Sequence, residues 1–292
     1  IVNKAPGEIV QGDKTGDEPL VETLKIWLKE KYDKPGNVFC GVVHRLDRPV
    51  GGLVVFAKTS KALTRLNEMF RNGDVEKTYW ALSRNIPASP EGRLEHYITT
   101  TERNNKSYAS LTEKKNSKKA ILSYKLLGSS DRYNLIEVKL ETGRKHQIRV
   151  QLSAIGCPIK GDLKYGDKRS NPDGSISLMA RRIRFVHPVS GEVIDVTAPL
   201  PADPLWQAFE IVYMSVQPSV MKIDLDEVLR QRVSAYYPFI PRWVIRKLEN
   251  YICQDGLNKL LQNNASLDGV DFCRGVIGDL GVRYNVHGSL PA

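Results

Sequence analysis

The chain has 292 residues, of which 41% are hydrophobic and 26% are charged. This composition is that of a folded globular protein, so it excludes a wholly disordered chain, a collagen-like fibre and a coiled coil. No apolar run approaches the roughly 18 residues that a membrane-spanning helix requires, and no charged-then-apolar leader follows Ile1, so we expect no signal peptide. Because the start IVNKAPGE is typical of a chain that begins within a strand, we expect that residues are missing before it.

The formal net charge of +10 is concentrated in the first part of the chain. Residues 221–292 contain 9 Lys and Arg against 8 Asp and Glu, so nearly all of the excess lies in residues 1–220. A basic surface gains affinity for polyanions because each neutralised phosphate releases counterions. This favours a nucleic-acid partner over a merely solvated surface, with a membrane-facing surface as a further alternative.

The four cysteines are far apart in the sequence: Cys40, Cys157, Cys253 and Cys273. None of them forms a C-x-x-C pair, which argues against a zinc site and against a disulfide scaffold. We therefore expect reduced thiols, a cytoplasmic location, no metal and no cofactor.

In chain order, the apolar run 53–57 predicts one buried strand. Thr59 and Ser60 can cap a helix that continues to Phe70, with Gly73 at its C-cap. Further strands are predicted at residues 78–82, 120–127 and 133–140, followed by a helix from His146 to Gly156 and a hairpin formed by residues 178–186 and 192–198.

The segment between Thr101 and Lys119 is polar and basic, and it predicts either a loop or a ragged hairpin. A phosphate-contacting finger and a solvated charged loop are equally compatible with it. Isolated His96 and His287 favour surface or capping roles, and His187 favours a structural role in a turn.

Three segments carry residues suited to chemistry. The first, GVVHRLDRPVGG at residues 41–52, places His44, Arg45, Asp47 and Arg48 within five positions of a glycine- and proline-containing loop. A carboxylate between two arginines suits a nucleophile or an electrostatic stabiliser. The alternative is a surface ion-pair cluster at the start of a strand.

The second segment, TGRKHQIR at residues 142–149, joins a strand to a helix with basic side chains that suit an anion. The alternative there is ordinary capping of a basic surface helix. The third segment is EKTYWA at residues 76–81, where Tyr79 and Trp80 point to opposite faces of a strand, so at least one should leave the core side. Such an aromatic side chain can stack on a base, although packing alone is the commoner role.

Together these segments resemble the RluA-like RNA pseudouridine synthases. GVVHRLDRPVGGLVVFAKT resembles the H-R-L-D motif of that family, EKTYWAL its second motif and TGRKHQIRVQLSAIGCPIKGDLKYG its third. VNKAPGE resembles its opening strand, and LMARRIRFVHPVSGEVIDVTAPLP its final hairpin, so the resemblance covers nearly all of residues 1–205. It implies an α+β fold with a mixed, mostly antiparallel sheet, flanking helices and a central basic cleft.

The resemblance also implies an enzyme that isomerises uridine to pseudouridine in rRNA or tRNA. Asp47 matches the essential aspartate, Tyr79 the tyrosine that lies against the base, and Arg149 the arginine that pairs with the aspartate. Three roles are open for Asp47: attack on the sugar carbon, attack on the base, or removal of a sugar proton. The target uridine must first be flipped out of its stack. The residues expected to contact RNA are His44, Arg45, Arg48, Arg144, Lys145 and His146.

Two departures from the family pattern leave an alternative open. The family continues H-R-L-D-R-x-T-S-G, whereas Val50 and Gly51 here replace the two hydroxyl residues, and VNKAPGE reverses the usual Pro-Ala order. The sequence shows no S4-type RNA-binding domain before the motifs, and the residues that we expect to be missing before Ile1 leave its presence open. An RNA-binding protein with impaired catalysis is therefore a second hypothesis.

The C-terminal part changes character. We predict a catalytic domain at residues 1–205, a linker at 206–220 and a helical segment at 221–292. That segment resembles the helical leader of hemolysin-like lysophospholipid acyltransferases, but the sequence ends before the H-x-x-x-x-D pair that those enzymes use. We expect no acyl transfer, and membrane association only through this segment. A fragment of a bifunctional fusion is the alternative, and the sequence predicts no oligomeric state.

Overall fold

The computed structural model describes residues 1–209, so the predicted helices in residues 221–292 and all but the first residues of the predicted linker lie outside the described part. The chain divides into two compact units, one formed by residues 1–127 with 132–200, and a second formed by 128–131 with 201–292. Of the second unit, residues 204–209 are helical. No helix among the described residues is both long and apolar enough to cross a membrane.

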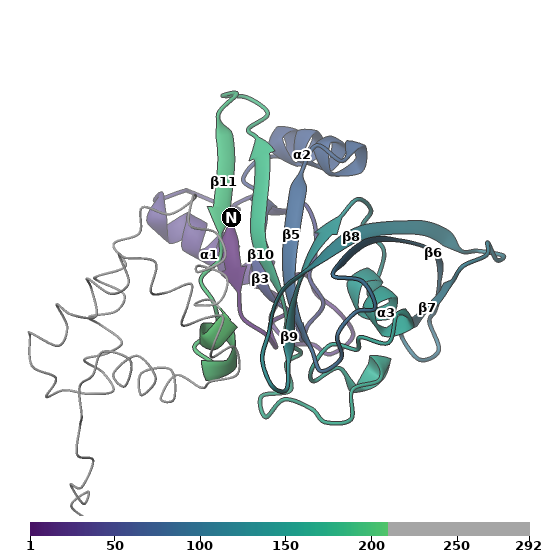
Figure 1. Cartoon of the computed structure of the whole chain (residues 1–292). Helices are drawn as coiled ribbons and strands as arrows, with labels where there is room; N and C mark the ends of the chain where they lie inside the picture. The colour runs from purple at the N-terminus through teal and green to yellow at the C-terminus, as the bar shows by residue number, and fades with distance from the viewer. Residues whose placement is uncertain (210–292) are drawn as a thin grey trace, which may run out of the picture. The chain divides into compact units, whose positions relative to one another are not determined.

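The first unit is built on one large sheet (Figure 1). Its strand order is β1-β3-β10-β5-β9-β8-β6-β7, and β11 pairs with β10. The strands are β1 (Val2–Lys4), β3 (Gly51–Val54), β5 (Glu76–Ser83), β6 (Glu91–Thr101), β7 (Lys106–Ser110), β8 (Lys118–Ser129), β9 (Asn134–Leu140), β10 (Leu178–Val186) and β11 (Val193–Thr197). β3 and β10 run parallel, whereas β5 is antiparallel to both β10 and β9. The predicted α+β fold with a mixed, mostly antiparallel sheet is confirmed.

The predicted strand over residues 53–57 is wrong as a single element. Residues up to Val54 pair with β1 and β10, whereas β4 (Phe56–Ala57) pairs with β2 (Gly41–Val42) in a small second sheet. The break falls at Val55, whose backbone N–H donates to Nε2 of His44 at 3.0 Å. The Val55 N–H is thus used by the His44 side chain instead of by a neighbouring strand, at the point where hydropathy alone predicts a continuous strand.

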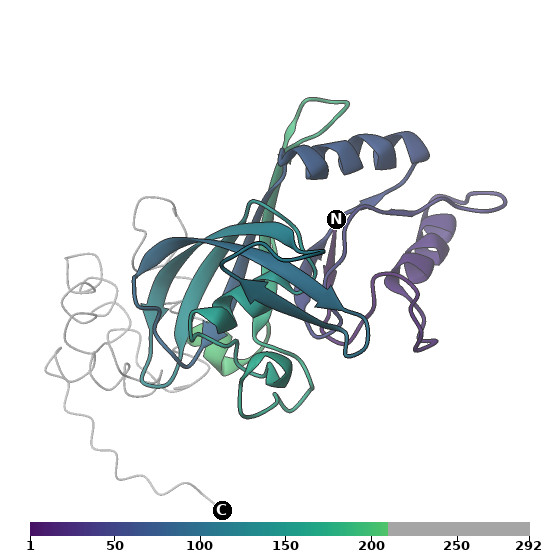
Figure 2. The ribbon, with the colours of Figure 1, turned by 90° about the vertical axis from the view of Figure 1, so that its right-hand side faces the viewer.

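Two helices pack against this small sheet. In α1 (Leu20–Lys31), Val21 and Leu28 share an apolar cluster with Phe56, and α2 (Ser60–Asn72) contacts both β2 and β4. Figure 2 shows both helices at the same end of the unit. The sequence predicted α2 correctly: Thr59 Oγ1 accepts the Ala62 N–H at 3.1 Å, and Gly73 ends the helix in a left-handed conformation.

α3 (Gln147–Ala154) lies inside the curve formed by β6 to β8, as Figure 1 shows. Its Ile148 and Leu152 belong to the main core, together with Ala81 of β5 and Ile136 of β9. A short 3₁₀ helix, η1 (Leu163–Tyr165), follows and also contacts α3. The predicted helix in the third motif is thereby confirmed, and its first turn is brought next to the H-R-L-D loop.

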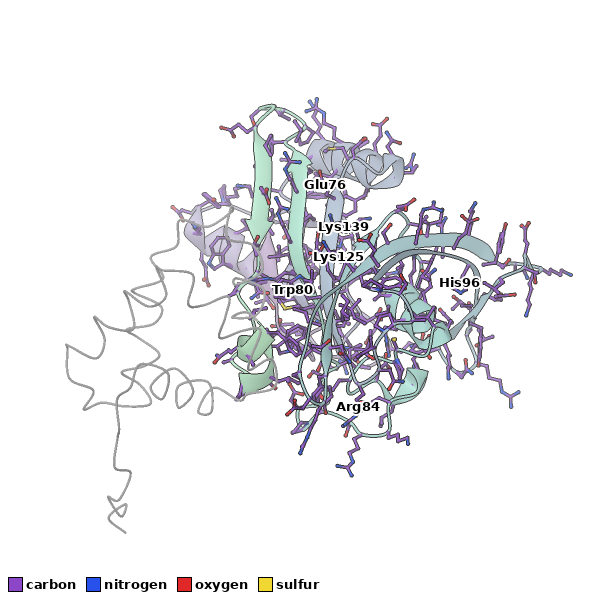
Figure 3. All side chains as sticks on the ribbon, in the orientation of Figure 1. Glu76, Trp80, Arg84, His96, Lys125 and Lys139 are labelled. Carbon is purple, nitrogen blue, oxygen red and sulfur yellow. The ribbon has the colours of Figure 1, made fainter. Side chains whose placement is uncertain are left out.

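Two local predictions need correction. His96 is not a surface residue, because it is only 6% exposed and its Nδ1 lies 3.0 Å from Nε2 of Gln151 on α3 (Figure 3). Tyr79 and Trp80 do point to opposite faces of β5, but both are under 10% exposed because the two faces are covered.

The segment 101–119 forms the β6–β7 hairpin and the start of β8, so of the two predicted forms the hairpin is confirmed.

Candidate active site

Asp47 lies in the loop between β2 and β3, between two buried apolar anchors. Leu46 and Val50 point into the main core, and the Val50 N–H donates to the Asp47 carbonyl at 3.0 Å. This tight turn leaves the Asp47 side chain 27% exposed. The carboxylate is thus held at the edge of the core, where a ligand can reach it.

The loop is also tied to the first strand by Lys4, a residue that sequence reasoning did not select. Lys4 is 1% exposed, and its Nζ donates to the carbonyls of Ala5, Glu8 and Arg48 at 2.9, 2.8 and 3.2 Å. Burial lowers the pKa of Lys4 to about 8. The buried ammonium therefore fixes the backbone immediately after Asp47.

Arg149 on α3 meets Asp47, as the sequence predicted. Its Nη1 donates to Asp47 Oδ2 at 2.9 Å, although the two residues are 102 positions apart. The arginine is only 6% exposed. The structure thus brings the predicted pair into contact, while their catalytic roles remain predictions.

Asp162 completes this arrangement and was missed by the sequence analysis. Arg149 Nε and Nη2 donate to its two carboxylate oxygens at 2.7 and 2.9 Å, which is the planar two-point pairing that arginine favours. Burial alone would lower the pKa of Arg149, but hydrogen bonding and attraction to Asp162, and then to Asp47, raise it above its usual value. The available signal was the acidic residue in the turn of IKGDLKYG.

His146 lies directly before α3 in a left-handed conformation, with φ of 55°. Its Nδ1 lies 2.7 Å from the Tyr165 hydroxyl, which also accepts the Ser107 N–H at 2.7 Å. The hydroxyl proton is thus assigned to Nδ1, and the imidazole proton to Nε2, 3.7 Å from Asp47 Oδ2. Burial lowers the pKa of His146 to about 4, against the attraction of Asp47, so the ring is neutral near pH 7.

Tyr79 approaches the same site from β5, opposite Val138 of β9. Burial, and then the negative charge of Asp47, raise the pKa of Tyr79, so its hydroxyl stays protonated. The site therefore combines one partly exposed carboxylate, a buried guanidinium, a neutral imidazole and a neutral phenol.

The remaining predicted RNA contacts divide into exposed and internal residues. Arg45 and Lys145 are exposed, as is Arg144, whose Nε donates to the Lys119 carbonyl at 2.9 Å. Arg48 is exposed and pairs with Asp17. His44 is used within the protein: it stacks on Phe70 with ring centres 4.8 Å apart, and burial, together with the charge of Lys77, lowers its pKa to about 4. Their roles in RNA binding remain predictions.

The replacement of the family's two hydroxyl residues by Val50 and Gly51 has a packing explanation. Val50 is 2% exposed in the main core, and a side chain on Gly51 would lie 3.2 Å from Pro6. Neither residue contributes a side chain to the contacts that hold Asp47, because these come from Arg149 and from the Val50 backbone. The replacement of two hydroxyl residues by Val50 and Gly51 therefore removes none of the contacts that hold the Asp47 carboxylate.

The described residues contain no group of three or more His, Cys, Asp or Glu side chains placed to hold a metal ion. Within the same part of the chain, Cys40 and Cys157 are free, buried thiols.

Comparison with known proteins identifies the family of the chain. The family model described as RNA pseudouridylate synthase matches residues 1–154, more than half of the chain. The chain belongs to this family. Among solved structures, Human RNA Pseudouridylate Synthase Domain Containing 4 has the same fold, with a TM-score of 0.59, 24% identity, and coverage of 72% of this chain and 88% of that one.

Curated relatives include synthases for two classes of RNA. The chain is 33% identical to "Uncharacterized RNA pseudouridine synthase YlyB" of Bacillus subtilis over 70% of this chain and 66% of that protein. It is 31% identical to "tRNA pseudouridine synthase C" of Vibrio parahaemolyticus (70% and 87% covered) and 31% identical to "Ribosomal large subunit pseudouridine synthase D" of Zymomonas mobilis (70% and 67% covered). The chain thus spans about two thirds of the length of the first and third of these relatives.

Proposed function

We propose that this protein is an RNA pseudouridine synthase that isomerises uridine in rRNA or tRNA, with Asp47 as its indispensable residue. The observation that carries the proposal is the contact of Asp47 with Arg149, which is itself held by Asp162. Membership of the family supplies the reaction type, and the relatives named for ribosomal RNA and for tRNA supply the two substrate classes.

The geometry supports a division of labour among these groups. A base stacked within an RNA helix cannot reach a carboxylate held at the edge of a protein core. The uridine must therefore be flipped out of the RNA stack, at a cost of a few kcal/mol. Tyr79, whose hydroxyl keeps its proton, then offers a neutral aromatic ring beside Asp47 for the flipped base to contact. In the isomerisation the bond from C1′ to N1 breaks, a bond from C1′ to C5 forms, and the C5 proton is lost while N1 gains one.

Contacts with the RNA backbone offset the cost of flipping. The exposed basic residues nearest in sequence to the site are Arg45 and Arg48 of the H-R-L-D loop and Arg144 and Lys145 before α3. The β6–β7 hairpin adds Arg103 and Lys106 on the side of α3. Each phosphate neutralised in this way adds affinity that falls as salt rises.

The first test is tritium release from RNA labelled at uridine C5. Total RNA from a strain that lacks the enzyme is separated into rRNA and tRNA, and each is incubated with the wild-type protein and with Asp47→Asn. We expect release by the wild type from one of the two classes and release at background from Asp47→Asn, because the amide removes the charge that Arg149 pairs.

Two outcomes would contradict the proposal. Equal release by both proteins would show that Asp47 is dispensable. No release by the wild type, with RNA binding retained, would favour the binding-only hypothesis. Gel-shift measurement of RNA affinity for both proteins separates these cases.

We also propose a cytoplasmic location, supported by the expected RNA substrates and by the free thiols of Cys40 and Cys157. Residues 221–292 lie outside the described part of the chain, and we propose no activity for them. Any association with a membrane would then depend on that segment.

A further inference from the structure

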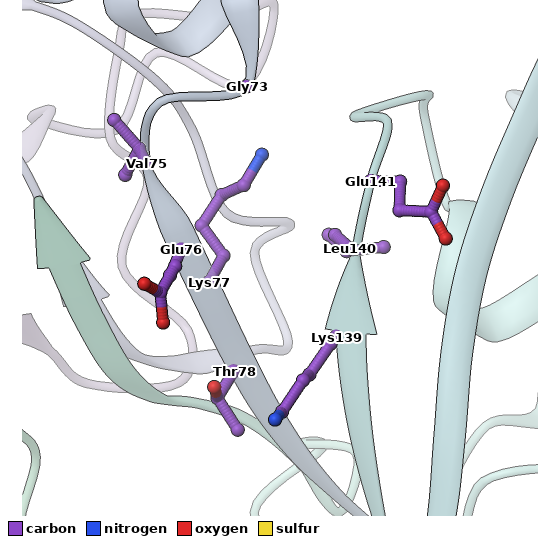
Figure 4. Close-up of a pocket in the computed structure, with 8 residues that line it drawn as sticks. All are labelled: Gly73, Val75, Glu76, Lys77, Thr78, Lys139, Leu140 and Glu141. Carbon is purple, nitrogen blue, oxygen red and sulfur yellow. The ribbon is translucent and has the colours of Figure 1, made fainter.

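A pocket lies where β5 and β9 separate. The pairing of the two strands ends at Thr78 and Lys139, and beyond these residues the backbones diverge (Figure 4). The space between residues 73–78 and 139–141 has a volume of about 280 Å³. This is just below the roughly 300 Å³ at which pockets for drug-sized ligands begin, so it fits a small group rather than a whole nucleotide.

Lys77 supplies the pocket with a partly buried positive charge. Figure 4 shows its side chain reaching into the gap between the two strands. Its Nζ lies 5.6 Å from the ring centre of Phe70, and burial lowers the pKa of Lys77 without a carboxylate to oppose the effect. Within the described part of the chain, no hydrogen bond or ion pair engages this ammonium.

The two carboxylates that line the pocket are engaged elsewhere. Glu76 pairs with Arg184 at 2.9 Å, and Glu141 pairs with Arg93 at 2.9 Å. Both point away from the gap in Figure 4. The second lysine of the pocket, Lys139, is 69% exposed and lies 4.0 Å from Glu137. The pocket therefore holds an excess of positive charge, and Lys77 is the less exposed of its two lysines.

The pocket adjoins the candidate active site along one strand. Lys77 and Tyr79 lie on the same face of β5, two residues and thus about 6.6 Å apart. Lys77 is also close enough to His44 to contribute to the lowering of that residue's pKa. A nucleotide whose base lies against Tyr79 would bring its own or its neighbour's phosphate to this end of the strand.

We propose that the pocket binds one phosphate of the RNA backbone next to the target uridine, with Lys77 as the counter-ion. This inference rests on the proposed function, because it assumes that a uridine occupies the site beside Tyr79. A phosphate diester matches the pocket in charge and in size. It would replace the water lost by the partly buried ammonium with charge-assisted hydrogen bonds.

The test compares Lys77→Met, which keeps the apolar stem over Phe70, with Lys77→Arg, which keeps the charge. Lys125→Met removes an exposed lysine of the same sheet and is the matched control. RNA affinity is measured from 50 to 300 mM salt, and KM and kcat are measured by tritium release. For Lys77→Met we expect binding about tenfold weaker, the lower end for a hydrogen bond to a charged group, with a salt slope reduced by about 0.7.

Lys77→Arg should restore most of the affinity, and kcat at saturating RNA should change by less than about threefold, since the contact is made to the backbone and is equal in ground and transition states. Lys125→Met should behave as the wild type. A second measurement uses a short RNA substrate with a neutral methylphosphonate on either side of the mapped uridine. One of the two should weaken wild-type binding by the same factor and leave Lys77→Met unaffected.

Unchanged RNA affinity in Lys77→Met, or equal losses in Lys77→Met and Lys77→Arg with a lower melting temperature, would overturn the proposal, the second result in favour of a packing role. If the wild type releases no tritium from any RNA, the proposed function fails instead. Tritium release by the wild type therefore distinguishes failure of the phosphate-binding proposal from failure of the proposed function.

Discussion

One guanidinium joins two carboxylates at the centre of the site. Asp162 uses two N–H groups of Arg149 and leaves a third for Asp47. Removing these charges from water is costly, and the cost is offset only when the geometry is good and every partner is bonded. We therefore expect Asp162 to act through Arg149 as a positioning residue, because both of its carboxylate oxygens are engaged by that guanidinium.

We predict that Asp162→Asn lowers kcat about 10- to 100-fold while RNA affinity stays within about twofold. This is the range of loss seen in metal sites when the residue that orients a metal ligand by a hydrogen bond is replaced. The asparagine cannot accept both N–H groups, so Arg149 loses its fixed orientation. Single-turnover tritium release and RNA binding measure the two effects. Asp173→Asn is the control. Asp173 lies in the loop between η1 and β10 and accepts hydrogen bonds from Ser175, not from Arg149.

A matching loss in Asp173→Asn, or a loss of RNA affinity as large as the loss of kcat in Asp162→Asn, would argue against the positioning role. A fall in kcat without a change in affinity would support it, because a merely destabilised protein loses both together.

The sequence could predict Asp47, Tyr79 and Arg149, because each lies in a segment of recognisable residue order. It could not select Lys4 or Asp162 by spacing. Lys4 acts through carbonyl groups, which leave no trace in side-chain patterns, and one of them is 44 residues away. Asp162 meets Arg149 only after the turn that follows α3 folds back.

At the scale of elements, Tyr165 connects η1 to two other parts of the site. Its hydroxyl accepts the N–H of Ser107 on β7 and donates to His146 before α3. Ser107 Oγ in turn donates to the Lys145 carbonyl at 2.8 Å. The basic hairpin and the segment that carries Arg149 are therefore linked twice, through the Tyr165 phenol and through the direct hydrogen bond from Ser107 to Lys145.

We predict that Tyr165→Phe keeps the fold but loosens the hairpin. The Ser107 N–H loses its buried acceptor, which costs about 1–3 kcal/mol. Hydrogen exchange at the Ser107 amide should accelerate, and RNA affinity should fall. Tyr108→Phe, an exposed tyrosine of the same hairpin, is the control. Unchanged exchange at Ser107 would contradict the proposed link.

The limits of an element were predicted well where neighbouring residues mark them, and poorly where they depend on residues that are distant in the sequence. α2 has a Thr59 cap and a terminal glycine, so its limits follow from sequence. α1 was not predicted, because exposed Ile26 and Trp27 blur its apolar stripe. The run at residues 53–57 was predicted as one strand, because nothing local reveals that His44 captures the Val55 N–H.

On the scale of the whole first unit, an early and a late strand of the chain meet where β3 runs beside β10. Gly52 has φ of +111°, and a Cβ there would lie 2.4 Å from the Ala180 carbonyl oxygen. Only glycine permits both this conformation and this approach. The parallel pairing that places the H-R-L-D loop against the final hairpin depends on this one position.

We predict that Gly52→Ala destabilises the protein by about 3 kcal/mol or more, because strain and backbone overlap combine. Gly12→Ala is the control, since a Cβ added at Gly12 would have no neighbour within 4 Å and its φ is not left-handed. Chemical denaturation measures both variants. A free energy of unfolding for Gly52→Ala equal to that of Gly12→Ala would show that the strands can separate without cost.

The pairing of one guanidinium with two carboxylates has an electrostatic consequence for substrate entry. His146 and Tyr79 are neutral near pH 7, so the charges gathered at the site are those of Asp47, Arg149 and Asp162 and, behind the loop, Lys4. These four groups sum to no net charge, whereas the whole protein has a net charge of +10. The phosphates of an RNA are therefore attracted chiefly to the basic exterior, and an uncharged uracil ring meets a site in which the internal charges are balanced.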